Sequence, residues 1–216
     1  MNDNLRQLAF GFAKTARLND TAAAQSYRAN YANVTAFTPG ASPPSVVLCD
    51  TVTSDNFWHG TLLAEAFENT TTLFTNGSGV YCTTQQEDNA TLEVLMRGTI
   101  SGLVDFSRII IMRTVANFDR PFPGQTAVES LFADNGGLQA SLNNIHIAGV
   151  KIIQGIVDGW DYKFKAGVQP DNYIGDVFGS LGGQPDFGPG SLFNGHQAPS
   201  VRSLSLKKGD QRLGRM

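Results

Sequence analysis

An unbroken apolar run, Ile109 to Met112, lies between Arg108 and Arg113. A helix that crosses a bilayer needs about 18–20 apolar residues in succession, and no stretch of this chain approaches that length. Consecutive apolar side chains without polar alternation are typical of an inner strand whose sheet is covered on both faces. The sequence therefore predicts a buried strand over residues 107–113 of a soluble, layered α/β chain.

Other segments follow the helical and strand periods. Short apolar runs that follow turns predict strands over 45–49 and 79–82, and the Pro- and Gly-rich stretch 38–44 predicts a loop. Asn2 or Asp3 is expected to cap the first helix. Apolar residues at helical spacing predict helices over 3–18, 20–31, 60–68, 86–103 and 137–157. This alternation predicts a three-layer α/β fold, with a mixed or mostly parallel sheet flanked by helices.

Length and composition bound the class of protein. A chain of 216 residues with 41% hydrophobic and 16% charged residues is expected to fold as one domain. The formal net charge of -3 argues against a nucleic-acid partner. Residues 195–216 are basic and carry few large apolar residues, which predicts a disordered tail after a single domain over 1–194.

The two cysteines and the glycosylation motifs do not decide in which cellular compartment the protein folds. Cys49 and Cys82 form either one disulfide or two buried thiols, and two thiols is the expectation. The polar N-terminus shows no signal peptide. Either a secreted glycoprotein relative or an asparagine-rich composition explains the five Asn-x-Ser/Thr sites. These sites begin at Asn19, Asn33, Asn69, Asn76 and Asn89.

Three polar segments follow the predicted strands, where open α/β sheets bind their ligands. They cover residues 49–60, 83–92 and 112–121 and combine carboxylates, hydroxyls, aromatic rings and a guanidinium group. The candidate binding and catalytic residues are Ser54, Asp55, Phe57, Trp58, Glu87, Asp88, Arg113, Asn117 and Asp119.

Each segment also has a purely structural explanation. Glu87 and Asp88 in the first turn of a helix would offset its dipole. Phe57 and Trp58 suit a hydrophobic core, and His59 suits a loop. The placement of all three segments at strand ends favours a binding site over these separate explanations.

Longer motifs connect the chain to a known family. The motifs are GVYCTTQQEDNATLEVL at 79–95, DFSRIIIMRT at 105–114, NFDRP at 117–121, NYIGDVFGSLG at 172–182 and PDFGPG at 185–190. With them the chain resembles the fungal purine nucleoside permease family from about Leu5 to Phe193. It is similar, more distantly, to the nucleoside phosphorylase and nucleosidase superfamily. In that superfamily residues 86–90 match Glu-Met-Glu-Ala-Ala, residues 114–117 match Thr-Val-Ser-Asp, and residues 54–58 match Ala-Asp-Leu-Phe-Tyr.

The resemblance implies a phosphorylase-like fold and a site that binds or cleaves purine nucleosides at the N-glycosidic bond. Such a site needs a carboxylate at the sugar hydroxyls, an aromatic face for the base and a donor at purine N7. It implies that Asp88 holds the ribose and that Phe57 stacks on the base. Asn117 occupies the place of an aspartate general acid, with Asp119 as a reserve acid, while Glu87 replaces a methionine.

Asparagine at position 117 changes the expected chemistry. Its amide cannot give up a proton, but it donates one hydrogen bond and accepts another. Because a 6-oxopurine needs less help at N7 than adenine does, we expect inosine or guanosine to be preferred. No cofactor or metal is expected, and phosphate is a candidate co-substrate.

Two alternatives and one departure from the family accompany this hypothesis. A transport-associated nucleoside-binding protein without catalysis, or an inactive remnant or storage protein, would carry the same motifs. The resemblance also implies an N-terminal portion before Leu5 that supplies the first strands and a phosphate-binding loop. The chain is therefore expected to be a C-terminal portion with an exposed sheet edge, and a candidate homo-oligomer.

Overall fold

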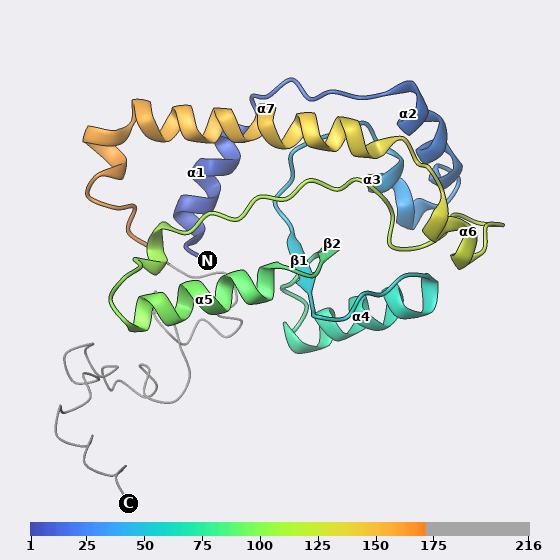
Figure 1. The fold of residues 1–216 in the computed structure, drawn as a ribbon, viewed down its shortest axis with the longest axis horizontal. Helices are drawn as coiled ribbons and strands as arrows, with labels where there is room; N and C mark the ends of the chain where they lie inside the picture. Colours follow the sequence, from blue (N-terminus) through green and yellow to red (C-terminus); the bar gives the residue numbers. More distant parts are fainter. Residues whose placement is uncertain (172–216) are drawn as a thin grey trace, which may run out of the picture.

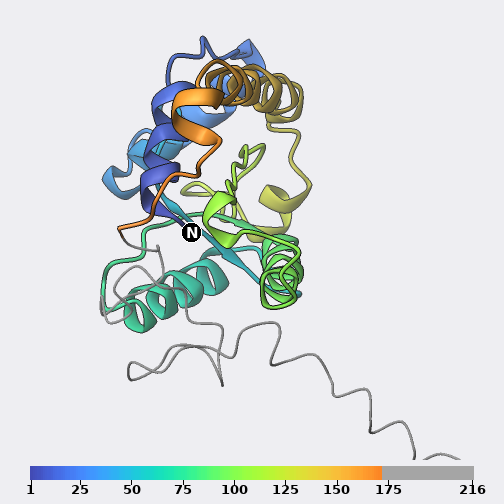
Figure 2. The ribbon, with the colours of Figure 1, turned by 90° about the vertical axis from the view of Figure 1, so that its left-hand side faces the viewer.

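The computed structural model describes residues 1–171. This part is a mixed α/β chain, with helices on both sides of a small sheet (Figures 1 and 2). Helices α1 (Asp3–Ala13) and α7 (Gly137–Asp158) lie on one side, and α4 (Thr61–Phe74) and α5 (Asp88–Ile100) lie on the other. The predicted tail and the two C-terminal family motifs lie outside the described residues.

The sheet consists of two parallel strands, β1 (Asp50–Thr53) and β2 (Tyr81–Gln85). Helix α4 connects them, as a parallel pair requires a crossover. Thr53 lies opposite Gln85, so the carboxyl ends of both strands meet at one edge. The chain leaves β1 and β2 there into segments predicted to bind a ligand.

The cysteines form a disulfide, so the expectation of two thiols is wrong. Cys49 directly precedes β1 and Cys82 is the second residue of β2, with Cα atoms 6.1 Å apart. Parallel pairing of the strands brings these residues together, although 33 positions separate them in the sequence. The bond closes a long loop and so restricts the unfolded chain.

The strand predicted over 107–113 is absent from the described fold, and that prediction is wrong. Residues 106–108 form the 3-10 turn η3 (Phe106–Arg108), and residues 109–116 run extended without a ladder. Ile110 and Met112 pack against the core between α1 and α7. The apolar run is therefore half-buried, but no strand of the described part pairs with it.

The remaining predicted strands and the loop are shifted. Residues 45–49 lie outside the ladder, because pairing begins only at Asp50. The strand predicted over 79–82 overlaps only the first two residues of β2. The loop predicted over 38–44 begins with a short helix, α3 (Thr38–Ala41), which has Pro39 in its first turn.

All five predicted helices are present with different ends. Helix α1 stops at Ala13, and α4 continues well beyond residue 68. Helix α2 (Ala22–Arg28) continues into the 3-10 turn η1 (Ala29–Tyr31). In the described residues no helix combines the length and the apolar character needed to cross a membrane. Besides α3 and η3, three further short elements were not predicted: η2 (Thr35–Phe37), α6 (Ala127–Phe132) and the π-helical turn η4 (Trp160–Phe164).

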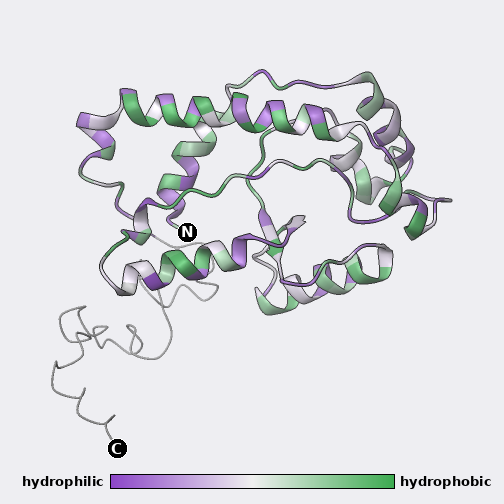
Figure 3. Cartoon of the chain, viewed as in Figure 1, coloured by the Kyte–Doolittle hydropathy of each residue, from purple (hydrophilic) through white to green (hydrophobic). Residues whose placement is uncertain are grey.

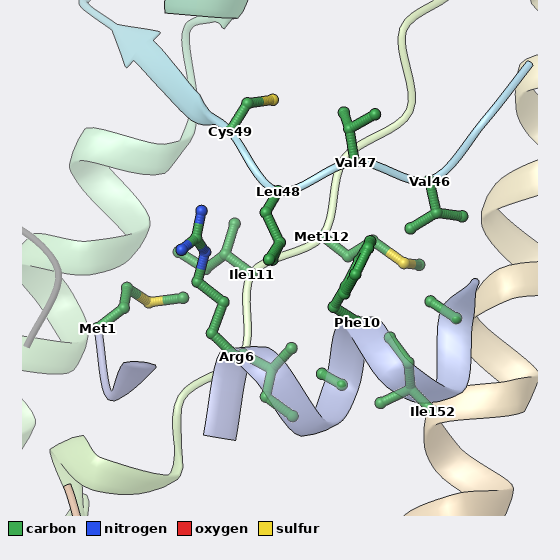
Figure 4. A pocket seen from close by; sticks show the side chains of 13 residues that line it. Met1, Arg6, Phe10, Val46, Val47, Leu48, Cys49, Ile111, Met112 and Ile152 are labelled. Carbon is green, nitrogen blue, oxygen red and sulfur yellow. The ribbon is translucent and has the colours of Figure 1, made fainter. Parts of the chain in front are cut away.

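Small residues allow α1 and α7 to pack closely. Ala9 and Ala13 of α1 meet Ala148 and Ile152 of α7, and all four are buried. A neighbouring pocket of about 90 Å³ lies between α1 and the extended segments 46–49 and 110–112 (Figure 4). The side chains that line this pocket are apolar apart from Arg6, and the pocket is too small for a typical ligand.

Asn2 fixes the N-terminus of the fold. Its Oδ1 accepts from the backbone N–H of Leu5 at 3.3 Å, which confirms it as the cap of α1. Its Nδ2 donates to the carbonyl oxygens of Ser107 at 3.0 Å and Val168 at 2.7 Å. This fully buried side chain therefore joins three segments that are distant in sequence.

Helix α7 also presents apolar residues outward. Figure 3 shows green residues along this helix, and Leu138, Leu142, Ile153 and Val157 are all exposed. Exposed apolar stripes are typical of surfaces that contact another protein segment. Homo-oligomerisation remains a prediction.

Candidate functional site

A pocket of about 160 Å³ lies at the carboxyl ends of β1 and β2. Its walls come from residues 56–58 after β1, residues 84–87 at the end of β2, and Asn117 from the extended segment. Ligand pockets typically measure about 300–1,000 Å³. This pocket therefore has room for one part of a nucleoside-sized ligand.

Two neighbouring aromatic residues take different positions in the pocket wall. Phe57 is 65% exposed, so the core explanation is wrong for it. Trp58 is only 6% exposed and stacks on Phe67, with ring centroids 4.0 Å apart. Its Nε1 donates to the Tyr81 hydroxyl at 3.4 Å. Trp58 thus forms fixed support, while Phe57 offers a free aromatic face.

The side-chain oxygen of Gln85 caps the start of α5. Its Oε1 accepts from the backbone N–H of Asp88 at 3.0 Å and from that of Glu87. The Glu87 carboxylate lies in the pocket wall and accepts from the backbone N–H of Gln86 at 3.2 Å. Negative charge here also suits the helix N-terminus, as the structural explanation required.

Asp88 is buried and paired rather than open to the pocket. Its exposed fraction is 3%, and its Oδ1 accepts from Nε of Arg113 at 2.9 Å and from a second guanidinium nitrogen. The hydrogen bond that Arg113 donates to Asp88 raises the pKa of Arg113. This pair joins α5 to the extended segment beside the pocket.

A polar network fixes the end of β1 to α5. Asp55 accepts from Nδ2 of Asn89 at 2.7 Å, and its carbonyl oxygen accepts from Nε2 of Gln86 at 3.1 Å. The Thr53 hydroxyl donates to Oδ1 of Asn89 at 3.0 Å. Ser54 accepts from the backbone N–H two residues further on at 3.2 Å. Ser54 and Asp55 therefore shape the loop that carries Phe57.

Asp119 lies in a second cluster, away from the pocket wall. It accepts from the Tyr81 hydroxyl at 2.7 Å and from the Arg120 guanidinium at 3.0 and 3.1 Å. Burial, together with the hydrogen bond to Asp119, raises the pKa of Tyr81 to about 12. Burial lowers the pKa of nearby His59, although Asp119 opposes this. The Asp119 carboxylate is thus held by two residues, Tyr81 and Arg120.

Asn117 is the candidate catalytic residue that the structure places in the pocket wall. The side chain of Asn117 is exposed and makes no hydrogen bond within residues 1–171. Its amide is therefore available to donate one hydrogen bond and to accept another.

The sequence thus predicted four pocket residues: Phe57, Trp58, Glu87 and Asn117. It missed Asn56, Thr84, Gln85 and Gln86 as wall residues, and Tyr81 as the partner of Asp119. If the strand predicted over 79–82 had been extended to residue 85, Gln85 would have been expected in the pocket wall, because alternate residues of a strand lie on the same face. No group of three or more potential metal-ligating side chains occurs in the described part of the chain.

The aromatic and polar pocket lies at the carboxyl ends of parallel strands, which is where open α/β sheets typically bind small ligands. The family model for purine nucleoside permease (NUP) matches residues 1–169, and the chain belongs to that family. A Candida albicans purine nucleoside permease is 47% identical over 196 residues, which cover 89% of this chain and 47% of the relative.

A second relative and the search for similar folds complete the comparison. A Schizosaccharomyces pombe protein named as a probable purine nucleoside permease is 39% identical over 163 residues, covering 75% of this chain and 46% of the relative. The chain therefore spans about half the length of these relatives. No solved structure matches the chain significantly, so a phosphorylase-like fold remains a prediction.

Proposed function

We propose that the pocket between residues 56–58, residues 84–87 and Asn117 binds the base of a purine nucleoside. The observation that carries this proposal is the exposed ring of Phe57 in a pocket that also holds the amide of Asn117, which makes no hydrogen bond within residues 1–171. A purine presents an aromatic face together with a polar edge, and this pocket offers a partner for each.

The names of the relatives support the same ligand class and point to purine nucleoside uptake. The pocket suits a base more than a whole nucleoside, because it is small. We place the ribose at the rim, where Glu87 is exposed. Asp88 and Arg113 then position the start of α5 below the sugar.

Calorimetric titration of the full chain with inosine tests this proposal. The parent protein is expected to bind, and Phe57→Ala is expected to weaken the affinity roughly tenfold or more, because stacking on an aromatic ring contributes about 1–3 kcal/mol per base. Phe74→Ala is the matched control, since Phe74 is an exposed phenylalanine on α4 outside the pocket. Equal losses of inosine affinity in Phe57→Ala and Phe74→Ala, or no inosine binding by the parent protein, would contradict the proposal.

A second candidate function is cleavage of the bound nucleoside, with water or phosphate as the acceptor. One observation favours it: Glu87 places a carboxylate in the pocket wall, and the structure shows no salt bridge to it within residues 1–171. In this candidate Asn117 hydrogen-bonds the departing base, and Asp119 acts as an acid only after it loses the bonds from Tyr81 and Arg120.

A base-release assay with and without phosphate separates cleavage from binding. If cleavage occurs, the parent is expected to act on inosine better than on adenosine, and Asn117→Asp is expected to raise the relative rate on adenosine. Glu87→Gln should reduce base release while leaving inosine affinity within about threefold, because its amide keeps the shape of the wall. Adenosine cleavage by the parent equal to or faster than inosine cleavage would exclude this account of Asn117.

A further inference from the structure

The disulfide between Cys49 and Cys82 is typical of a protein that folds in an oxidising compartment. Such bonds form and persist in the secretory pathway, whereas cytosolic thiols are kept reduced. The same pathway attaches glycans to asparagines in Asn-x-Ser/Thr motifs, and this chain has five of these motifs. The fold decides which of these asparagines can carry a glycan in the finished protein.

Asn76 lies in an exposed turn between α4 and β2. Its backbone has a φ of 50°, a left-handed conformation that asparagine adopts more readily than most residues, and Gly77 follows with a φ of 78°. The side chain of Asn76 is exposed and makes no hydrogen bond within residues 1–171. Ser78, which completes the motif, is exposed as well. A glycan on Nδ2 of Asn76 would therefore break no hydrogen bond of the described residues.

Asn89 is the opposite case, although it begins the same kind of motif. The Nδ2 of this half-buried residue donates to Asp55 at 2.7 Å, and its Oδ1 accepts from the Thr53 hydroxyl at 3.0 Å. These bonds join the end of β1 to the first turn of α5. A glycan on this nitrogen would force the two segments apart, because an N-linked glycan is bulky. We therefore expect Asn89 to stay unmodified in the folded protein.

Three large apolar side chains flank the motif at Asn76 in the sequence, and all three are exposed. Leu73 and Phe74 at the end of α4 are 75% and 76% exposed, and Val80 before β2 is 56% exposed. Exposed apolar surface of this kind favours association with other molecules. One face of N-acetylglucosamine presents C–H groups, which an aromatic ring such as that of Phe74 attracts. Because Phe74 precedes Asn76 by two residues, its ring is within reach of the first sugar.

We propose that Asn76 is an N-glycosylation site and that its glycan covers the apolar end of α4. The donor is an oligosaccharide linked to a lipid through a diphosphate. Nδ2 of Asn76 forms a bond to C1 of the first N-acetylglucosamine, while the bond from C1 to the diphosphate oxygen breaks. The amide loses one proton to a base of the transferase, and the lipid diphosphate leaves with the bonding electrons.

The position of Asn76 keeps the glycan away from the candidate pocket. The turn that holds Asn76 precedes β2, and the backbone N–H of Val80 donates to the Asp50 carboxylate at 2.8 Å. Asp50 and Tyr81 are the first residues of the two strands. The glycan therefore starts at the amino ends of the strands, whereas the pocket lies at their carboxyl ends. Glycosylation at Asn76 is thus compatible with any ligand of the pocket.

Mass spectrometry of the full chain, produced in yeast behind a secretion signal, measures the occupancy of each motif separately. An amidase that removes N-glycans in heavy-oxygen water converts each occupied asparagine to a labelled aspartate. Secreted and cell-retained protein are both digested, so poor secretion does not prevent the measurement. We expect most molecules to carry the label at Asn76 and few to carry it at Asn89. Ser78→Ala should abolish the label at Asn76, whereas the control Ser78→Thr keeps the hydroxyl group and the label.

Sedimentation velocity of the same variants tests whether the glycan covers the apolar end of α4. Ser78→Ala lacks only the glycan at Asn76, so its self-associated fraction is expected to exceed that of Ser78→Thr several-fold. In a Phe74→Ser background the exposed ring is absent. There the two variants at position 78 are expected to self-associate to the same low extent.

The results separate the glycosylation site from its covering role. Label at Asn76 in most molecules and at Asn89 in few supports the site. An unlabelled Asn76, or Asn89 labelled as fully as Asn76, overturns it. Equal self-association of Ser78→Ala and Ser78→Thr, with Asn76 occupied in Ser78→Thr, overturns the covering role and leaves the site intact.

Discussion

Replacing Tyr31 with alanine is expected to lower the free energy of unfolding by about 3–5 kcal/mol, as for other large buried aromatic side chains. Tyr31 is 1% exposed and stacks on Phe118, with ring centroids 4.1 Å apart and planes 13° apart. Phe37 and Phe122 meet the Tyr31 ring edge-on at 5.8 and 5.6 Å. The variant leaves a cavity at the centre of this aromatic cluster.

Tyr31→Phe is the matched control for the hydroxyl group. The Tyr31 hydroxyl donates to the carbonyl oxygen of Arg120 at 2.9 Å, and burial raises the pKa of Tyr31, so this donor stays protonated. Loss of the hydroxyl alone is expected to cost about 1 kcal/mol. Chemical denaturation measures both variants. A loss below about 1 kcal/mol for Tyr31→Ala would show that the cluster does not support the fold.

Gly137→Ala is expected to destabilise the fold by about 3 kcal/mol and to weaken inosine binding. A Cβ atom at Gly137 would overlap the carbonyl oxygen of Ala116 and would lie 3.0 Å from Oδ1 of Asn135. The Ala116 atoms that the Cβ atom would meet are backbone, so the start of α7 and the extended segment must separate. Asn117 directly follows Ala116, and it would move with that segment.

Gly149→Ala, on the same helix, serves as the control. A Cβ atom there would meet only Cε of Met112 at 3.5 Å, which is an ordinary contact. Alanine is the better helix former by about 1 kcal/mol, so this variant should be neutral or more stable. Thermal unfolding and inosine titration compare the two variants. Equal stability would show that the close approach at Gly137 does not position Asn117.

Helices were predictable from this sequence because their periodicity and caps are local. Asn2 shows this, since the residue type and position that predicted a cap are sufficient to form it. Strands were less predictable, because a ladder needs a partner. The apolar run Ile109 to Met112 has no paired strand in residues 1–171, whereas the threonine-rich β1 and β2 do pair.

The candidate site was predictable as a set of segments, but not as a set of contacts. Sequence position places Phe57 and Trp58 together in the pocket wall, yet Phe57 is exposed and Trp58 is buried against Phe67. The hydrogen bond from Tyr81 to Asp119 joins residues 38 positions apart, and no local pattern signals it. The disulfide likewise follows from strand pairing rather than from cysteine spacing.

A spectrum of the ¹⁵N-labelled chain during titration with inosine tests nucleoside binding most directly. The account predicts that the side-chain amide signals of Asn117 and Gln85, and the indole signal of Trp58, shift together and saturate. The side-chain amides of Asn143 and Gln154 on α7 lie outside the pocket and should not shift. Saturating inosine that leaves the Asn117 and Gln85 signals unmoved would contradict the account.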